Sequence, residues 1–120
     1  MNKIITASVL VASTFFTNET MAASMECYVD TQAHDQYTVG RCMAIVWGAR
    51  RATAVFRVTG TDKPISSVMW GDKASSCGSS GTSCSFQIPG YSSHRATATI
   101  LYQDGTWETT YARASFEDGR

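Results

Sequence analysis

RATATILYQDGTWETTYARASFE, residues 95–117, is the stretch that decides the fold. Small or apolar residues alternate with polar ones on both sides of Asp104-Gly105, and alternation with a period of two indicates a half-buried β-strand. Asp-Gly between two such runs is a strong short-range signal for a β-hairpin, because both residues tolerate a positive φ. The stretch therefore predicts two long antiparallel strands joined by a tight turn.

The register of this hairpin decides which side chains face the core. A two-residue loop would turn Trp107 and Tyr111 toward the alanines of the first strand. A loop of odd length with a glycine bulge would instead place Ala112, Ala114 and Phe116 on the core side. We favour the second register, because small and apolar residues suit a core and the arginine between them does not. It predicts an exposed stripe of aromatic side chains.

Period-two alternation recurs along most of the chain, and no internal repeat or helical period appears. Turn residues such as those at 60–64, GTDKP, separate the alternating stretches. Seven stretches qualify as strands: 25–30, 42–47, 52–59, 65–70, 84–88, 95–103 and 106–116. About seven short antiparallel strands in a domain of this size predict an all-β sandwich of two sheets.

Residues 95–117 resemble the last two strands of bacterial immunoglobulin-like and fibronectin-type sandwiches, in which a long strand passes through an Asp-Gly hairpin into the final strand. The resemblance implies an immunoglobulin-like antiparallel two-sheet sandwich of about seven strands. The chain departs from antibody domains, because no cysteine pair is expected to span the two sheets around a core tryptophan. An antibody-type domain is therefore not implied.

The first residues have the features of a secretory signal peptide. Lys3 precedes an apolar run at 4–16, and small residues follow at 22–24. This run is shorter than the roughly 20 residues of a membrane-spanning helix. We predict that residues 1–23 are removed on export, that residues 24–120 form a single domain, and that no membrane insertion remains. The small residues leave the cleavage point open.

Four cysteines follow this segment, and an even number in a small exported chain predicts disulfides. Of the three pairings that four cysteines allow, we favour Cys27–Cys42 and Cys77–Cys84, because each closes a local loop rich in turn-forming residues. The spacing does not suit zinc, since no C-x-x-C pair occurs. We expect no metal and no cofactor, and a periplasmic or alternatively a secreted protein.

Charge and motifs argue against two other classes of function. After loss of Lys3 and Glu19 the chain keeps balanced charge, which gives no electrostatic attraction for nucleic acid. The residues suited to acid–base catalysis stand in no recognised catalytic motif; they are His34, Asp35, Asp72, His94 and Glu108. We predict that the protein is not an enzyme, with a small hydrolase using Glu108 and either Asp72 or His94 as the third possibility.

Tryptophan and arginine residues point to a binding surface instead. These residue types dominate interface energy, because one offers a large rigid surface and the other a planar donor fork. Burial in the core is the alternative for Trp47 and Trp70. The predicted partner-binding residues are Trp47, Arg50, Arg51, Trp107, Tyr111, Tyr91 and His94.

A signal peptide followed by a compact two-disulfide β domain is similar to the small periplasmic immunity proteins that neutralise wall-degrading effectors of type VI secretion. The resemblance implies a protein partner, a peptidoglycan hydrolase, whose catalytic carboxylates could pair with Arg50 or Arg51. The alternative is a carbohydrate- or cell-wall-binding module in which Trp107 and Tyr111 stack on sugar rings. The exposed final strand could also pair across a two-fold axis in a homodimer.

Overall fold

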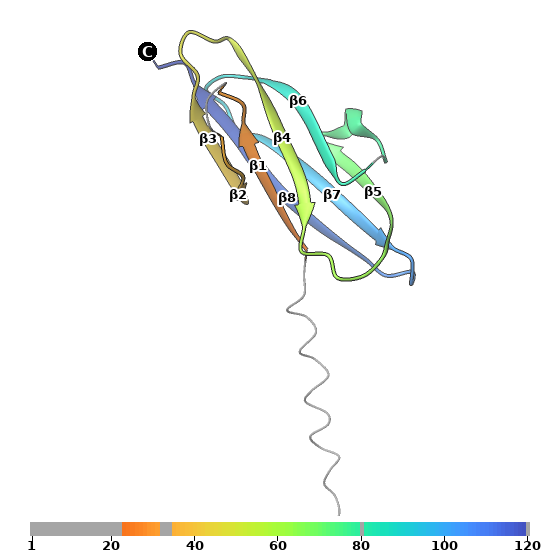
Figure 1. Cartoon of the computed structure of the whole chain (residues 1–120). Coiled ribbons are helices and arrows are strands. Elements are labelled where there is room, and N and C mark those ends of the chain that lie inside the picture. The colour runs from red at the N-terminus through yellow and green to blue at the C-terminus, as the bar shows by residue number, and fades with distance from the viewer. Residues whose placement is uncertain (1–22, 32–34, 80, 120) are drawn as a thin grey trace, which may run out of the picture.

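Two four-stranded β-sheets pack face to face in the computed structural model, which describes residues 23–31, 35–79 and 81–119 (Figure 1). The strands are β1 Ser24–Val29, β2 Thr38–Val39, β3 Arg41–Ile45, β4 Arg51–Thr59, β5 Ile65–Asp72, β6 Ser83–Pro89, β7 His94–Tyr102 and β8 Trp107–Glu117, with a short 3-10 turn, η2, at Ser75–Cys77. One sheet has the order β2-β1-β4-β6 and the other the order β3-β8-β7-β5. The predicted all-β two-sheet fold is confirmed.

Parts of two predictions fall on residues that the structure does not describe. Of the predicted signal peptide, residues 1–23, the structure describes only Ala23. His34 also lies outside the described residues. In the described ranges no helix is both long and apolar enough to cross a membrane.

The strand pairing differs from a fully antiparallel sandwich at β3. The chain leaves the first sheet at Gly40, whose φ of 81° favours glycine, and enters the second sheet at Arg41. There β3 pairs in parallel with β8, with Arg41 opposite Arg113 and Ile45 opposite Glu117. Our expectation of an antiparallel sandwich is therefore wrong for this pair, because the crossing brings β3 beside the last strand in the same direction.

The β7–β8 hairpin has the odd-length loop. Ala96 pairs with Ala112 and Leu101 with Trp107. At its end Tyr102 N–H donates a 2.8 Å hydrogen bond to the Thr106 carbonyl, and Gly105 takes a φ of 90°. This matches a three-residue loop with glycine in the left-handed conformation. The favoured register is confirmed: Trp107 and Tyr111 face outward, and Phe116 faces the core.

The core contains large side chains from one sheet and many small ones from the other. Met25, Phe56 and Ile88 come from β1, β4 and β6 and are at most 1% exposed. Opposite them four alanines of β7 and β8 are fully buried, namely Ala96, Ala98, Ala112 and Ala114. Because alanine adds little volume, the large side chains can fill the space between the sheets.

Two disulfides fasten the two lateral edges of the sandwich. Cys27 of β1 bonds to Cys42 of β3, and Cys77 of η2 bonds to Cys84 of β6. The predicted pairing is confirmed. The first bond also joins the two sheets, because the chain crosses from one sheet to the other at Gly40. Two disulfides fit an oxidising extracellular or periplasmic compartment.

Removing each disulfide should lower the free energy of unfolding, and the loss should be larger for Cys27–Cys42 than for Cys77–Cys84. The first closes a loop with a sequence separation of 15 and the second a loop of 7. Loop-closure entropy in the unfolded chain then predicts losses of about 3 and about 2 kcal/mol. Urea unfolding of Cys27→Ala/Cys42→Ala and of Cys77→Ala/Cys84→Ala measures both. A larger loss for the second variant would contradict this account.

The hairpin turn should make stability depend on pH. The Asp104 carboxylate accepts hydrogen bonds from the Thr106 hydroxyl at 2.5 Å and its N–H at 2.9 Å, and Lys63 lies 3.2 Å away. The Thr106 bonds, followed by Lys63, lower the pKa of Asp104 to about 2. The folded pKa lies below the unfolded value of about 4, so the contribution is present above about pH 4 and is lost as pH falls through the folded pKa.

We therefore expect Asp104→Asn to unfold at lower urea concentration than the wild type at pH 7. This difference should close as the pH falls from about 4 to about 2, because the wild-type carboxyl becomes protonated in that interval. Urea midpoints measured across this range test the expectation. A difference that is the same at both ends of the range would rule out the ionised carboxylate as its cause.

Candidate functional site

Six of the seven predicted partner-binding residues, all but His94, fall on two surfaces. Trp107 and Tyr111 lie on the side of sheet β3-β8-β7-β5 that faces away from the core, which we call the outer face. Trp47 and Arg50 lie at the end of the sandwich where the β3–β4 turn, the β6–β7 loop and the C-terminus come together (Figure 1). We call this second surface the C-terminal end.

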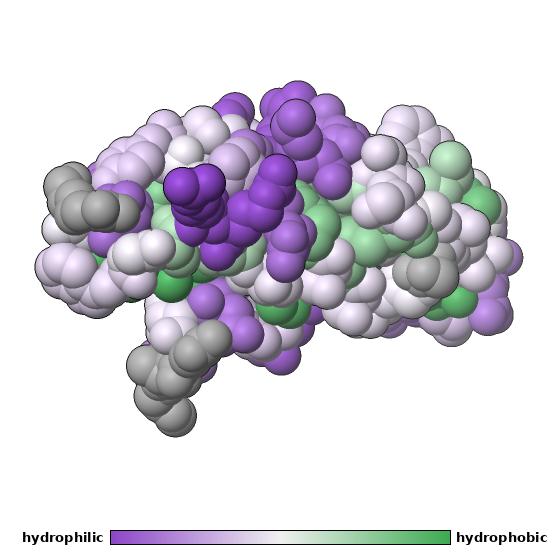
Figure 2. Space-filling view, turned by 90° about the horizontal axis from the view of Figure 1, so that it is seen from above, coloured by the Kyte–Doolittle hydropathy of each residue, from purple (hydrophilic) through white to green (hydrophobic). Residues whose placement is uncertain are grey.

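At the C-terminal end two aromatic side chains contact the last residues of the chain. Trp47 is 76% exposed and is therefore not a core residue. Its ring lies so close to Gly119 that a Cβ at this position would clash with it. Tyr91 donates a hydrogen bond from its hydroxyl to Asp118. Figure 2 looks down on the molecule of Figure 1 from above and shows strongly hydrophilic side chains across the middle of the view, with hydrophobic surface beside and between them.

Arg50 and Arg51 are both exposed beside this turn, but they belong to different elements. Arg50 lies in the β3–β4 turn, whereas Arg51 is the first residue of β4 in the other sheet. Arg51 also borders a small depression that contains Asp30 and Gln87. The two arginines are thus accessible to a partner from this end.

His94 does not belong to a recognition loop, which corrects its predicted position. It is the first residue of β7, its side chain points inward, and it is 8% exposed. Its Nε2 lies 2.9 Å from the Ser92 hydroxyl. The strand therefore begins earlier than the sequence predicts and carries His94 into the interior.

The outer face collects most of the exposed large apolar side chains. Nine such side chains occur in the described residues, and six of them lie here, so this face and not the C-terminal end is the main apolar surface. The strand registers place the six on four adjacent strands; they are Met43, Ile45, Met69, Leu101, Trp107 and Tyr111. A solvent-facing sheet surface is ordinarily polar.

Three arginines lie side by side across the outer face. Arg95 of β7 pairs in register with Arg113 of β8, which pairs with Arg41 of β3. The sequence predictions did not include them. The hairpin register could have revealed the first pair, whereas Arg41 joins it only through the parallel β3–β8 pairing. A depression of about 480 Å³ adjoins the row, with Lys73 and Ser93 in its lining.

Asp72 is the carboxylate that pairs with the first arginine of this row, Arg95. It has a φ of 56° at the end of β5 and accepts hydrogen bonds from the Thr97 hydroxyl and, at 2.9 Å, from Arg95 Nε. These two bonds lower the pKa of Asp72, the Thr97 hydroxyl having the larger effect. Asp72 is therefore a negatively charged partner for Arg95 at neutral pH.

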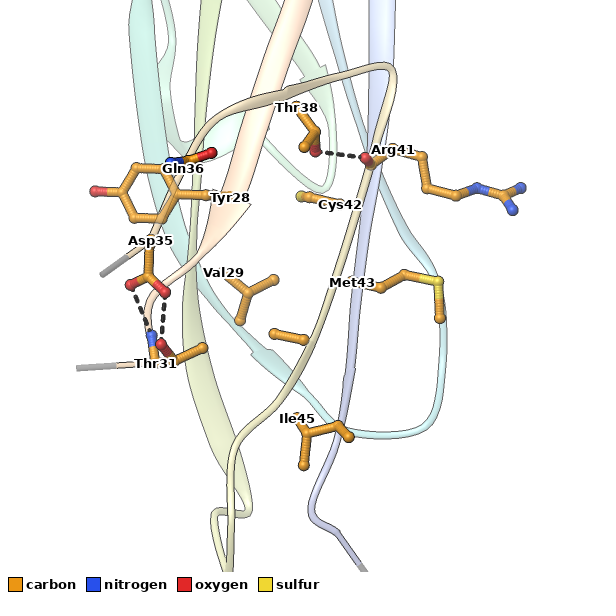
Figure 3. A pocket seen from close by; sticks show the side chains of 11 residues that line it. Tyr28, Val29, Thr31, Asp35, Gln36, Thr38, Arg41, Cys42, Met43 and Ile45 are labelled. Carbon is orange, nitrogen blue, oxygen red and sulfur yellow. Dashed lines mark hydrogen bonds between the residues drawn. The ribbon is translucent and has the colours of Figure 1, made fainter. Parts of the chain in front are cut away.

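A second pocket of about 480 Å³ lies where β1 and β3 diverge (Figure 3). Asp35 is its one described carboxylate, and it accepts a 2.9 Å hydrogen bond from the Thr31 N–H. Figure 3 shows the side chains of Arg41 and Met43 pointing away from Tyr28, Thr31 and Asp35, which lie on the opposite side of the pocket. This pocket lies beside β3, and its lining includes Arg41, Met43 and Ile45 at the edge of the outer face.

The residues suited to acid–base chemistry are held by separate structural contacts. Glu108 accepts hydrogen bonds from the Tyr102 hydroxyl and, at 2.9 Å, from the Ala23 N–H. Asp72 pairs with Arg95, and His94 contacts Ser92. Among the described residues no three His, Cys, Asp or Glu side chains gather as a metal site would require.

Comparison with protein-family models, with curated proteins and with solved structures yields no match. Functional assignment therefore rests on the residues of this chain. The outer face is the surface that these residues distinguish most clearly.

Tryptophan fluorescence should separate exposed from buried side chains. Trp47 and Trp107 are 76% and 65% exposed, whereas Trp70 is 6% exposed and donates its indole N–H to the Gly81 carbonyl. We expect Trp47→Phe/Trp107→Phe to lose most acrylamide quenching and to emit at shorter wavelength, because only Trp70 remains. If the Trp107→Phe variant alone is quenched as strongly as the wild type, the register of β8 described here is contradicted.

Proposed function

We propose that the protein is exported to the periplasm and binds another protein, acting as an immunity or inhibitor protein that occludes the active site of a peptidoglycan-degrading enzyme. The observation that carries the proposal is the outer face, where six exposed large apolar side chains and three arginines share one surface. Apolar patches of this kind on a sheet surface mark interaction sites.

The composition of this face fits a protein interface. Interface cores are enriched in aromatic residues, methionine and arginine. The outer face contributes Trp107 and Tyr111, two methionines and the three arginines. Rigid aromatic anchors bind with little loss of side-chain entropy, and arginine supplies directional hydrogen bonds. Binding would block an active site in a one-to-one complex, without turnover.

Export is supported by the pattern of residues 1–24 and by the two disulfides. We also propose that the sandwich is of the immunoglobulin-like type. In that type the first, second, fourth and fifth strands share one sheet, and the third, sixth and seventh share the other. The described residues have no counterpart of the fourth strand. Strands β1, β4 and β6 against β5, β7 and β8 support this arrangement, with β2 and β3 as short additions.

A carbohydrate- or cell-wall-binding module is the alternative. Trp107 and Tyr111 lie on the same face of β8, four residues apart, which places them about 13 Å from each other. Two aromatic rings presented in this way could stack on sugar rings of one glycan chain. The arginines beside Tyr111 favour a charged protein partner over a neutral glycan.

The test uses the oxidised protein purified from the periplasm as bait for envelope proteins of its own host, followed by an assay of peptidoglycan hydrolysis by whatever enzyme is retained. We expect hydrolysis to fall close to zero at equimolar bait. For the same inhibition, the variant Trp107→Ser/Tyr111→Ser should be required at a concentration at least about tenfold higher than the wild type.

Trp47→Ser/Tyr91→Ser is the matched control, because it removes two aromatic side chains from the C-terminal end and should inhibit like the wild type. Circular dichroism verifies that both variants fold. Retention of wall glycans with no hydrolase would replace the inhibitor function with the carbohydrate alternative. Equal inhibition by the wild type and the outer-face variant would remove the outer face as the binding surface.

A further inference from the structure

The three arginines of the outer face, Arg95, Arg113 and Arg41, form what we call the arginine row. The β7–β8 and β3–β8 registers make each of them a direct neighbour of the next. Neighbouring strands lie about 5 Å apart, so the two outer arginines are about 10 Å apart at the backbone. Like charges directly opposite each other destabilise a sheet. The arginine row therefore has a cost in stability that the fold itself does not require.

Within the described residues only Arg95, at one end of the arginine row, has a carboxylate in direct contact, and this carboxylate also attracts Arg113 from farther away. Arg95 pairs with Asp72 at 2.9 Å, and no described carboxylate lies within ion-pair distance of Arg113 or Arg41. Lys73 borders the same depression as Arg95 and Arg113 and adds a further positive charge. In a chain of zero formal net charge, this is a local concentration of cations.

Apolar side chains flank the arginine row along the strands. Tyr111 lies two residues before Arg113 on β8, and the Arg95 guanidinium carbon is 5.6 Å from its ring centroid. Met43 lies two residues after Arg41 on β3 and is 65% exposed. A partner that covered the row would also cover these side chains and exclude water, which strengthens charge-assisted hydrogen bonds. A small ion would leave them exposed.

We propose that the arginine row binds a pair of neighbouring carboxylates on the surface of an acidic protein partner. A guanidinium group matches a carboxylate with two parallel hydrogen bonds, so Arg113 and Arg41 can each receive one. This inference rests on the proposed function, because it takes the partner to be a protein. Glycoside hydrolases hold two catalytic carboxyl groups about 5–10 Å apart, which fits the spacing of the row.

The test uses a hexaglutamate peptide as the probe, titrated into the oxidised protein by calorimetry at low ionic strength. Arg41→Gln/Arg113→Gln removes two charges from the row. Arg57→Gln/Lys63→Gln is the matched control, because it removes the same charge from two exposed cations that lie outside the arginine row. We expect the row variant to bind at least about tenfold more weakly than the wild type and the control to bind like the wild type.

Thermal unfolding adds a second readout. Since Arg113 lies between two like charges, Arg113→Gln should raise the unfolding midpoint by a few degrees while it weakens binding. A lower midpoint would give Arg113 a structural role and contradict the proposal.

In the peptide titration, equal weakening of binding by both double variants would show an effect of net charge alone. Inorganic phosphate that binds as tightly as the peptide would show a simple anion site. Either result overturns the inference.

The hydrolase retained in the capture experiment separates this inference from the proposed function. If Arg41→Gln/Arg113→Gln inhibits that enzyme as well as the wild type does, the inference fails and the proposed function stands. If no hydrolase is inhibited but the peptide binds the row selectively, the proposed function fails and carboxylate binding by the row is supported.

Discussion

The register of the β7–β8 hairpin is the constraint on which the rest of the structure depends. The loop at Asp104-Gly105 aligns Ala96 with Ala112, so the small and apolar residues of β8 fill the core. Because side chains alternate along a strand, the same alignment turns Trp107 and Tyr111 outward and sets Arg113 beside Arg95. A slip by one residue would bury these aromatic and basic residues and expose the alanines. Core and binding surface are thus fixed by one turn.

The second feature is the way the sandwich edges are closed. One disulfide joins β1 to β3 across the sheets, and the other joins η2 to β6 on the opposite side. A domain of this size buries a modest core, so cross-links that restrict the unfolded chain supply a substantial share of its stability. This support offsets the cost of placing like-charged arginines opposite one another on the outer face.

Local patterns predicted most of the fold, and long-range pairing accounts for what they missed. The alternation of apolar and polar residues predicted the strands, and the Asp-Gly turn predicted the hairpin register. The spacing of the cysteines predicted both disulfides. The crossing at Gly40 and the parallel β3–β8 pairing have no local signal, so Arg41 could not be placed beside Arg113. His94 was placed in a loop because the two serines before it are typical loop residues, so the sequence did not indicate that β7 begins at His94. The exposure of Trp107 and Tyr111 followed from the register, whereas the arginine row required the structure.

The central claim is that the outer face, and not the C-terminal end, is the binding surface. The most direct measurement is hydroxyl-radical footprinting of the oxidised protein, free and in complex with the protein that it retains from the host envelope. The account predicts lower oxidation of Met43, Trp107 and Tyr111 in the complex, with Trp47 and Tyr91 unchanged. Protection of Trp47 and Tyr91 with unchanged oxidation of Met43, Trp107 and Tyr111 would contradict it.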